Sequence, residues 1–227
     1  MGALGVLEGW KIDPGNDSTA ETPEVAAKKR RGPEWMRVVL DKDPAARNVL
    51  EVLLYPSVHA LFFHRIAHWL YVRDVPVLPR AVSQFARLAT GGIEIHPGAR
   101  IGRRFFIDHG SGVVIGETAR VGDDVMLYHQ VTLGATGWWR DDGIGGKRRH
   151  PIVEDGVTIG VGASILGPVT IGAGSRIGAL AIVTEDVPPG STVVGPRASY
   201  VERRGEPVRR QTIRQLGERR DPPDYVI

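Results

Sequence analysis

The stretch IEIHPGARIGRRFFIDHGSGVVIGETARVGDDVMLYHQVTLG, residues 93–134, places an aliphatic residue at every sixth position with one slip. Glycine commonly follows the aliphatic residue, and the pattern resumes after an interruption and runs to residue 183. A repeat this regular is interpreted before any local propensity. Its aliphatic positions are Ile95, Ile101, Ile107 and Val113, then, after a two-residue slip, Ile115, Val121, Leu127 and Leu133, and finally Val153, Ile159, Ile165, Ile171, Ile177 and Val183.

A period of six fits a short extended segment followed by a turn. Three such segments close a triangular coil whose aliphatic side chains point inward, and each is worth about 1.5–3 kcal/mol when fully buried. Glycine and other small residues permit the tight corners. Ordinary β-hairpins would show a period of two instead. The pattern therefore favours a solenoid of stacked coils, which needs a cap at its open ends.

Helical patterns precede the repeat and can supply one cap. The first helix is expected to start at an Asp43 N-cap and to stop at Pro56. A second is expected from about Ser57, and a third from about Val77 to Gly91-Gly92.

The chain divides into four expected parts. Residues 1–34 show no sustained period and are expected to be a disordered extension. The other parts are a helical domain at 35–92, the solenoid at 93–200 with a loop insertion at 137–149, and a C-terminal tail at 201–227.

Composition excludes several classes of function. The chain has 227 residues, 42% of them hydrophobic and 24% charged, which is typical of a soluble protein. No apolar run of roughly 18 residues and no secretory signal is present, so we expect a cytoplasmic protein without a membrane partner. The absence of cysteine rules out disulfides, Cys-ligated zinc and thiol catalysis. The net charge is only +3 and the basic runs near both ends lack a motif context, so no nucleic-acid partner is expected.

Six motifs narrow the class further. In chain order they are DPAARN, HALFFHRIAHWLY, EIHPGARIGRRFFIDHGSGVVIGETARVGDDV, VTLGATG, KRRHP and VPPGSTVVGPRA. Over roughly residues 40–198 this ordered set resembles the serine O-acetyltransferases, which are hexapeptide-repeat acyltransferases. The resemblance implies a mainly β fold, a left-handed parallel β-helix preceded by a small helical domain, and this handedness is an exception to the usual right-handed crossover.

The resemblance also implies a histidine general base. His109 in IDHGSG matches the catalytic histidine of the family, and an unperturbed pKa of about 6.5 suits that role at pH 7. Glu94 matches the carboxylate that orients this histidine, where the family pattern has Asp. The two residues are fifteen positions apart, close to one coil, so they can lie on one edge. An ordinary surface or core Asp-His pair is the alternative.

By the same matching, four residues are expected to bind serine. Asp43 and Asp108 would face its ammonium group and Arg149 its carboxylate, with His150 reaching the site from a neighbouring subunit. The alternatives are a helix cap for Asp43 and a flexible charged loop for Arg149 and His150. Main-chain contacts to acetyl-CoA are matched at Ala135, Val161 and Ala179.

The remaining histidines are expected to be structural. His59, His64 and His68 fall on the second expected helix and His96 stands beside Pro97, whereas His129 receives no role. No metal site is expected, because no pair of histidines combines metal-ligand spacing with a third ligand nearby.

The activity implied is transfer of the acetyl group of acetyl-CoA to the hydroxyl of L-serine, in cysteine biosynthesis, by a trimer or a dimer of trimers. Glu94 and the Trp138-Trp139 pair in the insertion depart from the family pattern, which leaves a different hydroxyl acceptor open. The tryptophans can cover either a ligand or a subunit contact. A silent scaffold partner of cysteine synthase is the other alternative, and Ile227 resembles the C-terminal isoleucine that binds that enzyme in the family.

Overall fold

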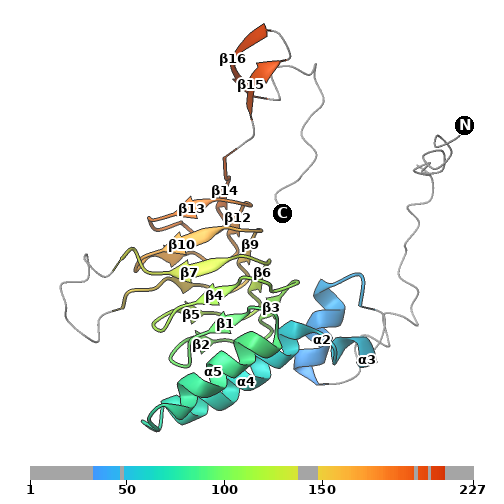
Figure 1. The fold of residues 1–227 in the computed structure, drawn as a ribbon, viewed down its shortest axis with the longest axis vertical. Helices are drawn as coiled ribbons and strands as arrows, with labels where there is room; N and C mark the ends of the chain where they lie inside the picture. Colours follow the sequence, from blue (N-terminus) through green and yellow to red (C-terminus); the bar gives the residue numbers. More distant parts are fainter. Residues whose placement is uncertain (1–32, 47–48, 138–147, 197–198, 204–205, 213–227) are drawn as a thin grey trace, which may run out of the picture.

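A computed structural model describes residues 33–46, 49–137, 148–196, 199–203 and 206–212. Its helices lie at one end of a three-sided stack of β-strands (Figure 1). The extension at 1–32, Trp138-Trp139 and Ile227 lie outside the described residues. The boundaries of the four expected parts remain predictions.

Three parallel sheets form the sides of the β-helix. The first sheet contains β1 (Glu94–Ile95), β4 (Val114–Ile115), β7 (Thr132–Gly134), β10 (Ser164–Leu166) and β13 (Ile182–Val183). The second contains β2 (Arg100–Ile101), β5 (Arg120–Val121), β8 (Ile152–Val153) and β11 (Thr170–Ile171). The third contains β3 (Phe106–Ile107), β6 (Met126–Leu127), β9 (Thr158–Ile159), β12 (Arg176–Ile177) and β14 (Thr192–Val193).

The aliphatic positions of the repeat form the core of this left-handed β-helix. Leu127, Leu133, Ile159 and Ile165 are fully buried, and only Ile101 of the predicted set is partly exposed. Each is stacked on the equivalent residue of the next coil through the parallel register. The predicted fold class is therefore confirmed.

The two-residue slip falls at one corner of the first coil. Ile95 pairs with Ile115, 20 residues later, whereas Ile115 pairs with Leu133, 18 residues later. The two additional residues lie in the corner at 108–113, between β3 and β4. This is the corner that carries His109.

Four helices precede the β-helix: α2 (Glu34–Lys42), α3 (Val49–Val52), α4 (Pro56–Tyr71) and α5 (Leu78–Ala89). The second and third predicted helices correspond to α4 and α5. Helix α2 was not predicted; it buries Met36, Val39 and Leu40 on one face, against Phe106 of β3.

The predicted helix from Asp43 to Pro56 is wrong, since only the four residues of α3 are helical in that segment. Asp43 instead ends α2 with an extended backbone, and its Oδ1 accepts a hydrogen bond from the amide of Ala45 at 2.7 Å. Leu50 and Leu54 are 75% and 78% exposed, so the apolar spacing in this segment does not mark a buried helix face.

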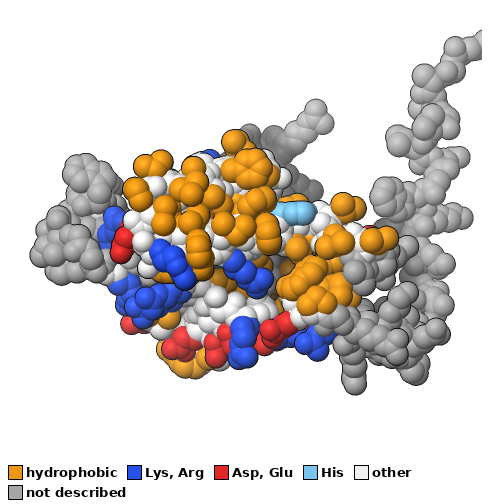
Figure 2. Space-filling view, turned by 90° about the horizontal axis from the view of Figure 1, so that it is seen from below, with side chains coloured by type: hydrophobic (Ala, Val, Ile, Leu, Met, Phe, Trp, Pro, Cys, Tyr) orange, Lys and Arg blue, Asp and Glu red, His pale blue; other side chains and the backbone are white. Residues whose placement is uncertain are grey.

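Helices α4 and α5 bury their small residues and expose large ones. The buried side chains include Ser57, Ala60 and Ala67 of α4 and Ser83 and Ala86 of α5. Figure 2 shows hydrophobic side chains gathered on the face of the helical end, and those exposed on these helices are Phe62, Ile66, Trp69, Tyr71, Leu78, Phe85 and Leu88. This apolar helical face suits a further contact.

At the opposite end, β15 (Ser199–Arg203) and β16 (Glu206–Thr212) pair in antiparallel fashion. No helix in the described part of the chain is both long and apolar enough to span a membrane.

His64 connects α4 to the bottom of the β-helix. Burial, with smaller contributions from the charges of His68 and Arg65, lowers the pKa of His64 to about 4, although a hydrogen bond with the main chain of Ala99 acts in the opposite direction. A histidine in the unfolded chain has a pKa near 6.5. The unfolded state therefore binds a proton first as the pH falls, and acid favours unfolding.

We expect the free energy of unfolding to decrease by about 2 kcal/mol from this group between pH 7.5 and pH 5, with most of the loss below pH 6.5. Urea titrations at several pH values measure it. A His64→Gln variant should lose this share of the pH dependence, whereas the exposed His59→Gln should keep it. Equal pH dependence in His64→Gln and the parent protein would contradict the assignment.

Candidate active site

The predicted site residues lie along two edges of the β-helix. The histidine edge comprises the corners between the third and first sheets, at 108–113, 128–131, 160–163 and 178–181. The arginine edge comprises the corners between the first and second sheets, at 96–99, 116–119, 135–151 and 167–169, of which 138–147 is not described. Successive corners of the histidine edge are joined by main-chain hydrogen bonds such as Gln130 N to Ser111 O.

His109 projects from the slipped corner. Its φ of 58° lies in the left-handed region, which is unusual for a residue other than glycine, and its side chain is 74% exposed. Its Nε2 lies 3.9 Å from Oδ2 of Asp108. The imidazole is thus accessible to a substrate and adjacent to a carboxylate.

His129 lies beside His109, one slipped coil later. The two rings are 5.7 Å apart and meet edge to face, and the Nδ1 atom of His129 is buried with no hydrogen-bond partner among the described residues. Sequence reasoning left His129 without a role. The available signal was its spacing of 20 residues from His109, which equals the 20-residue spacing of the first coil.

Two carboxylates gather near His109. The Tyr55 hydroxyl donates a short hydrogen bond to Oδ2 of Asp43. Burial, this hydrogen bond and the charges of Asp43 and Asp108 all raise the pKa of Tyr55. Burial and the charge of Asp108 likewise raise the pKa of Tyr128. The structure therefore brings Asp43 and Asp108 together around Tyr55, a partner that sequence reasoning missed.

Arg149 and His150 lie on the arginine edge. Arg149 Nη2 is 3.0 Å from Oε2 of Glu117, whose Oε1 accepts a hydrogen bond of 2.9 Å from the Tyr71 hydroxyl. The Tyr71 hydrogen bond, the charge of His96 and the contact with Arg149 lower the pKa of Glu117. This network links α4 to the predicted serine-binding arginine.

The Thr118 hydroxyl holds the main chain of the same segment. It accepts hydrogen bonds from the amides of Arg149 at 2.9 Å and His150 at 3.1 Å, and lies 2.8 Å from Nδ1 of His150. The buried ring of His150 packs directly on Gly116. The orientation of His150 is therefore fixed within its own chain.

Glu94 lies at the start of β1, under the corner that carries His109. Its amide donates to Val113 O at 2.9 Å, and a Cβ atom added to Gly110 would lie 2.4 Å from Cδ1 of Ile93. The carboxylate of Glu94 forms ion pairs with two arginines of α5, described further below. His109 and Glu94 thus share one edge, as the spacing predicted.

The three residues matched to acetyl-CoA contacts divide between the edges. Val161 and Ala179 lie in adjacent corners of the histidine edge, where Leu180 N donates to Val161 O at 2.8 Å. Ala135 follows β7 on the arginine edge. Their roles remain predictions, as do those of the catalytic and serine-binding residues.

The site therefore falls into two halves within one chain. His109, Asp108 and Asp43 belong to one half, and Arg149 and His150 to the other. Among the described residues no group of three or more His, Asp or Glu side chains is arranged to hold a metal ion.

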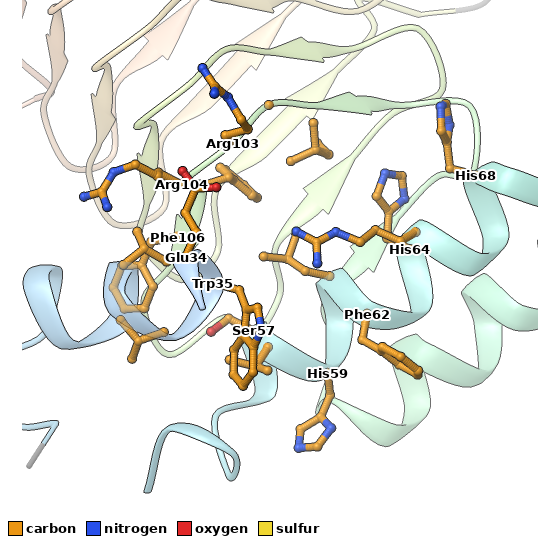
Figure 3. Close-up of a pocket in the computed structure, with 18 of the residues that line it drawn as sticks. Glu34, Trp35, Ser57, His59, Phe62, His64, His68, Arg103, Arg104 and Phe106 are labelled. Carbon is orange, nitrogen blue, oxygen red and sulfur yellow. The ribbon is translucent and has the colours of Figure 1, made fainter. Parts of the chain in front are cut away.

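A cavity of about 960 Å³ lies elsewhere, between α2, α4 and the first coil. Trp35, Phe62, His64 and Arg103 are among its lining residues (Figure 3). None of the predicted catalytic or ligand-binding residues lines it. The candidate site is consequently at the open edges of the β-helix and not in this cavity.

Stacked hexapeptide coils with an exposed histidine at one corner define a hexapeptide-repeat acyltransferase. The family model described as bacterial transferase hexapeptide (six repeats) matches residues 150–185.

The chain belongs to the serine acetyltransferase family. It is 56% identical over 161 residues to the serine acetyltransferase of Mycobacterium tuberculosis, covering 70% of this chain and 67% of that one. It is 51% identical over 194 residues to that of Bacillus licheniformis, with 85% and 84% covered. The crystal structure of the Neisseria gonorrhoeae serine acetyltransferase in complex with serine matches with a TM-score of 0.65 and 37% identity, covering 76% of this chain and 67% of that one.

The packing of His150 on Gly116 gives a prediction. An added methyl group at Gly116 would lie 1.9 Å from Cδ2 of His150, so Gly116→Ala should displace the ring and lower the free energy of unfolding by about 1–3 kcal/mol in urea titrations. At Gly134 the nearest atom, Cδ2 of Leu166, would be 3.1 Å away at the end of a flexible side chain. Gly134→Ala is the matched control, and an equal loss in both variants would refute the fixed position of His150.

Proposed function

We propose that this chain transfers the acetyl group of acetyl-CoA to the hydroxyl of L-serine, giving O-acetyl-L-serine and CoA in cysteine biosynthesis. The observation that carries the proposal is the exposed His109 imidazole, held at a left-handed corner beside Asp108. Membership of the serine acetyltransferase family supports the choice of substrates.

The reaction needs no acyl-enzyme. A nitrogen of the neutral His109 ring removes the proton from the serine hydroxyl as the oxygen attacks the thioester carbonyl carbon. The tetrahedral intermediate collapses, the carbon–sulfur bond breaks, and the CoA sulfur takes the proton from His109. General base catalysis of this kind contributes about 10²–10⁴ in rate, and holding the two substrates together contributes more.

Serine is a zwitterion, and the two halves of the site match its two charges. Asp43 and Asp108 offer carboxylates to the ammonium group. Arg149 offers a guanidinium to the carboxylate, with His150 beside it. Glu94 orients His109, and acetyl-CoA lies along the groove with main-chain contacts at Ala135, Val161 and Ala179.

The active unit is a homotrimer with its sites between adjacent chains. This follows from the division of the site, because the histidine edge of one chain can meet the arginine edge of the next around a three-fold axis. The exposed apolar helical face of α4 and α5 supports further association into a dimer of trimers.

The remaining parts of the proposal concern location and partners. We place the enzyme in the cytoplasm, without a resident metal and with acetyl-CoA as co-substrate. Contact of Ile227 with cysteine synthase is supported only by the resemblance of the C-terminal residue.

An acceptor screen tests the activity. With acetyl-CoA present, release of the CoA thiol should depend on L-serine, and His109→Ala should lower kcat by about 10²–10⁴ because the general base is lost. The side chain of His109 is exposed, so the melting temperature should hardly change, and His59→Ala is the matched control. Turnover only with other amino alcohols would show a different acceptor, and none with any acceptor would point to the scaffold alternative.

Mixed trimers test the shared site. His109→Ala and Arg149→Ala homotrimers should both be nearly inactive. Random 1:1 mixing puts both variants into three quarters of the trimers, each with one intact site of three, so about one quarter of the parent activity should return. No recovery, despite confirmed subunit exchange, would place both residues of a site in one chain.

A further inference from the structure

The outer face of α5 carries two arginines that meet one carboxylate. Arg80 Nη2 lies 3.3 Å from Oε1 of Glu94, and Arg87 Nη1 lies 3.2 Å from Oε2. The arginines are seven residues apart, about two helical turns, so they share one face of α5. Each carboxylate oxygen therefore has its own guanidinium partner. We call these three residues the arginine clamp.

Burial distinguishes the clamp from a common surface salt bridge. The Glu94 side chain is only 17% exposed, whereas the two arginines are about half exposed, at 51% and 52%. A partly desolvated carboxylate gains more from ionic partners than an exposed one does, and losing a partner is correspondingly costly. The α5 arginines thus keep a nearly buried charge paired and fix its orientation.

The clamp reaches the candidate catalytic base through β1. Helix α5 packs on β1, where the Ser83 hydroxyl donates to Ile95 O at 2.8 Å. The corner that carries His109 lies on the start of the same strand, through the Glu94 N to Val113 O hydrogen bond. A change in the position of the Glu94 carboxylate would therefore act directly beside His109.

The clamp also accounts for a glutamate at this position. The family pattern noted above has Asp, and Glu has one more methylene and one more rotatable bond. Without restraint, that added freedom would make the carboxylate position less definite. Two guanidinium contacts, one on each oxygen, remove it.

We propose that Arg80 and Arg87 are positioning residues for acetyl transfer, which hold the Glu94 carboxylate where it orients His109. The inference rests on the proposed function of His109 and Glu94. It assigns to the two arginines no contact with serine or acetyl-CoA.

A mutant cycle on the full-length protein tests this. The Arg80→Gln/Arg87→Gln protein should lose roughly 10-fold in kcat, with the KM for serine changed by less than about 2-fold, because misplacing a catalytic group affects the chemical step. Glu94→Gln should lose at least as much. The triple variant should then be no slower than Glu94→Gln alone, since residues that act through one another are not additive.

Two further variants complete the design. Arg80→Lys/Arg87→Lys keeps both charges and should retain kcat within about 3-fold. Arg103→Gln breaks the 2.7 Å ion pair with Asp123 at a distant corner and should leave kcat unchanged. Melting temperatures identify any variant that fails to fold, in which case the lysine variants are carried through the cycle with Glu94→Gln instead.

Several results would overturn the clamp. Additive losses in the triple variant, a full kcat in Glu94→Gln, or a raised KM for acetyl-CoA at constant kcat would each assign the arginines another role. The proposed function fails differently: the parent protein would then release no CoA thiol in the presence of serine.

Discussion

Parallel register between coils is the constraint on which the rest of the structure depends. Each aliphatic side chain points inward only if its strand pairs with the equivalent strand of the next coil, as Ile115 does with Leu133. A fully buried Ile or Leu is worth about 1.5–3 kcal/mol, so a shift of one residue in a coil would be severely destabilising. The same register stacks the corners into edges. It therefore aligns His109, His129, Val161 and Ala179 along one edge without any contact designed for that purpose.

The candidate base lies where this regularity is interrupted. Two residues beyond the regular 18-residue spacing lengthen the corner at 108–113, and His109 adopts a left-handed backbone at a cost of about 1–2 kcal/mol. Strain of this kind persists when the surrounding structure compensates for it. Here the compensation comes from Ile107 and Ile115, buried on either side of the corner. The imidazole is consequently exposed while its flanking residues stay in the core.

The sequence predicts features that depend on a repeated local pattern, and misses those that depend on one tertiary contact. The stacked core, α4 and α5 all follow from spacing and from breakers such as Pro56 and Gly91-Gly92. The segment after Asp43 has helical spacing too, yet Asp43 binds the Ala45 amide and the Tyr55 hydroxyl and ends α2. The pairs of Glu94 with α5 carry no sequence signal, because arginines on an amphipathic helix are ordinarily solvated. His129 had a usable signal, its coil spacing from His109.

The distribution of charge explains why one chain is not enough. Carboxylates of Asp43 and Asp108 lie near the histidine edge, and the guanidinium of Arg149 lies on the arginine edge, with the first sheet between them. A short zwitterion such as serine cannot span two edges of the same prism. Unlike edges of neighbouring chains can meet, however, and a heterologous contact of this type closes into a ring when its rotation is 120°. The geometry that makes the solenoid rigid thus leaves each half-site incomplete, and the internal hydrogen bonds of Thr118 with His150 keep the second half prepared for its neighbour.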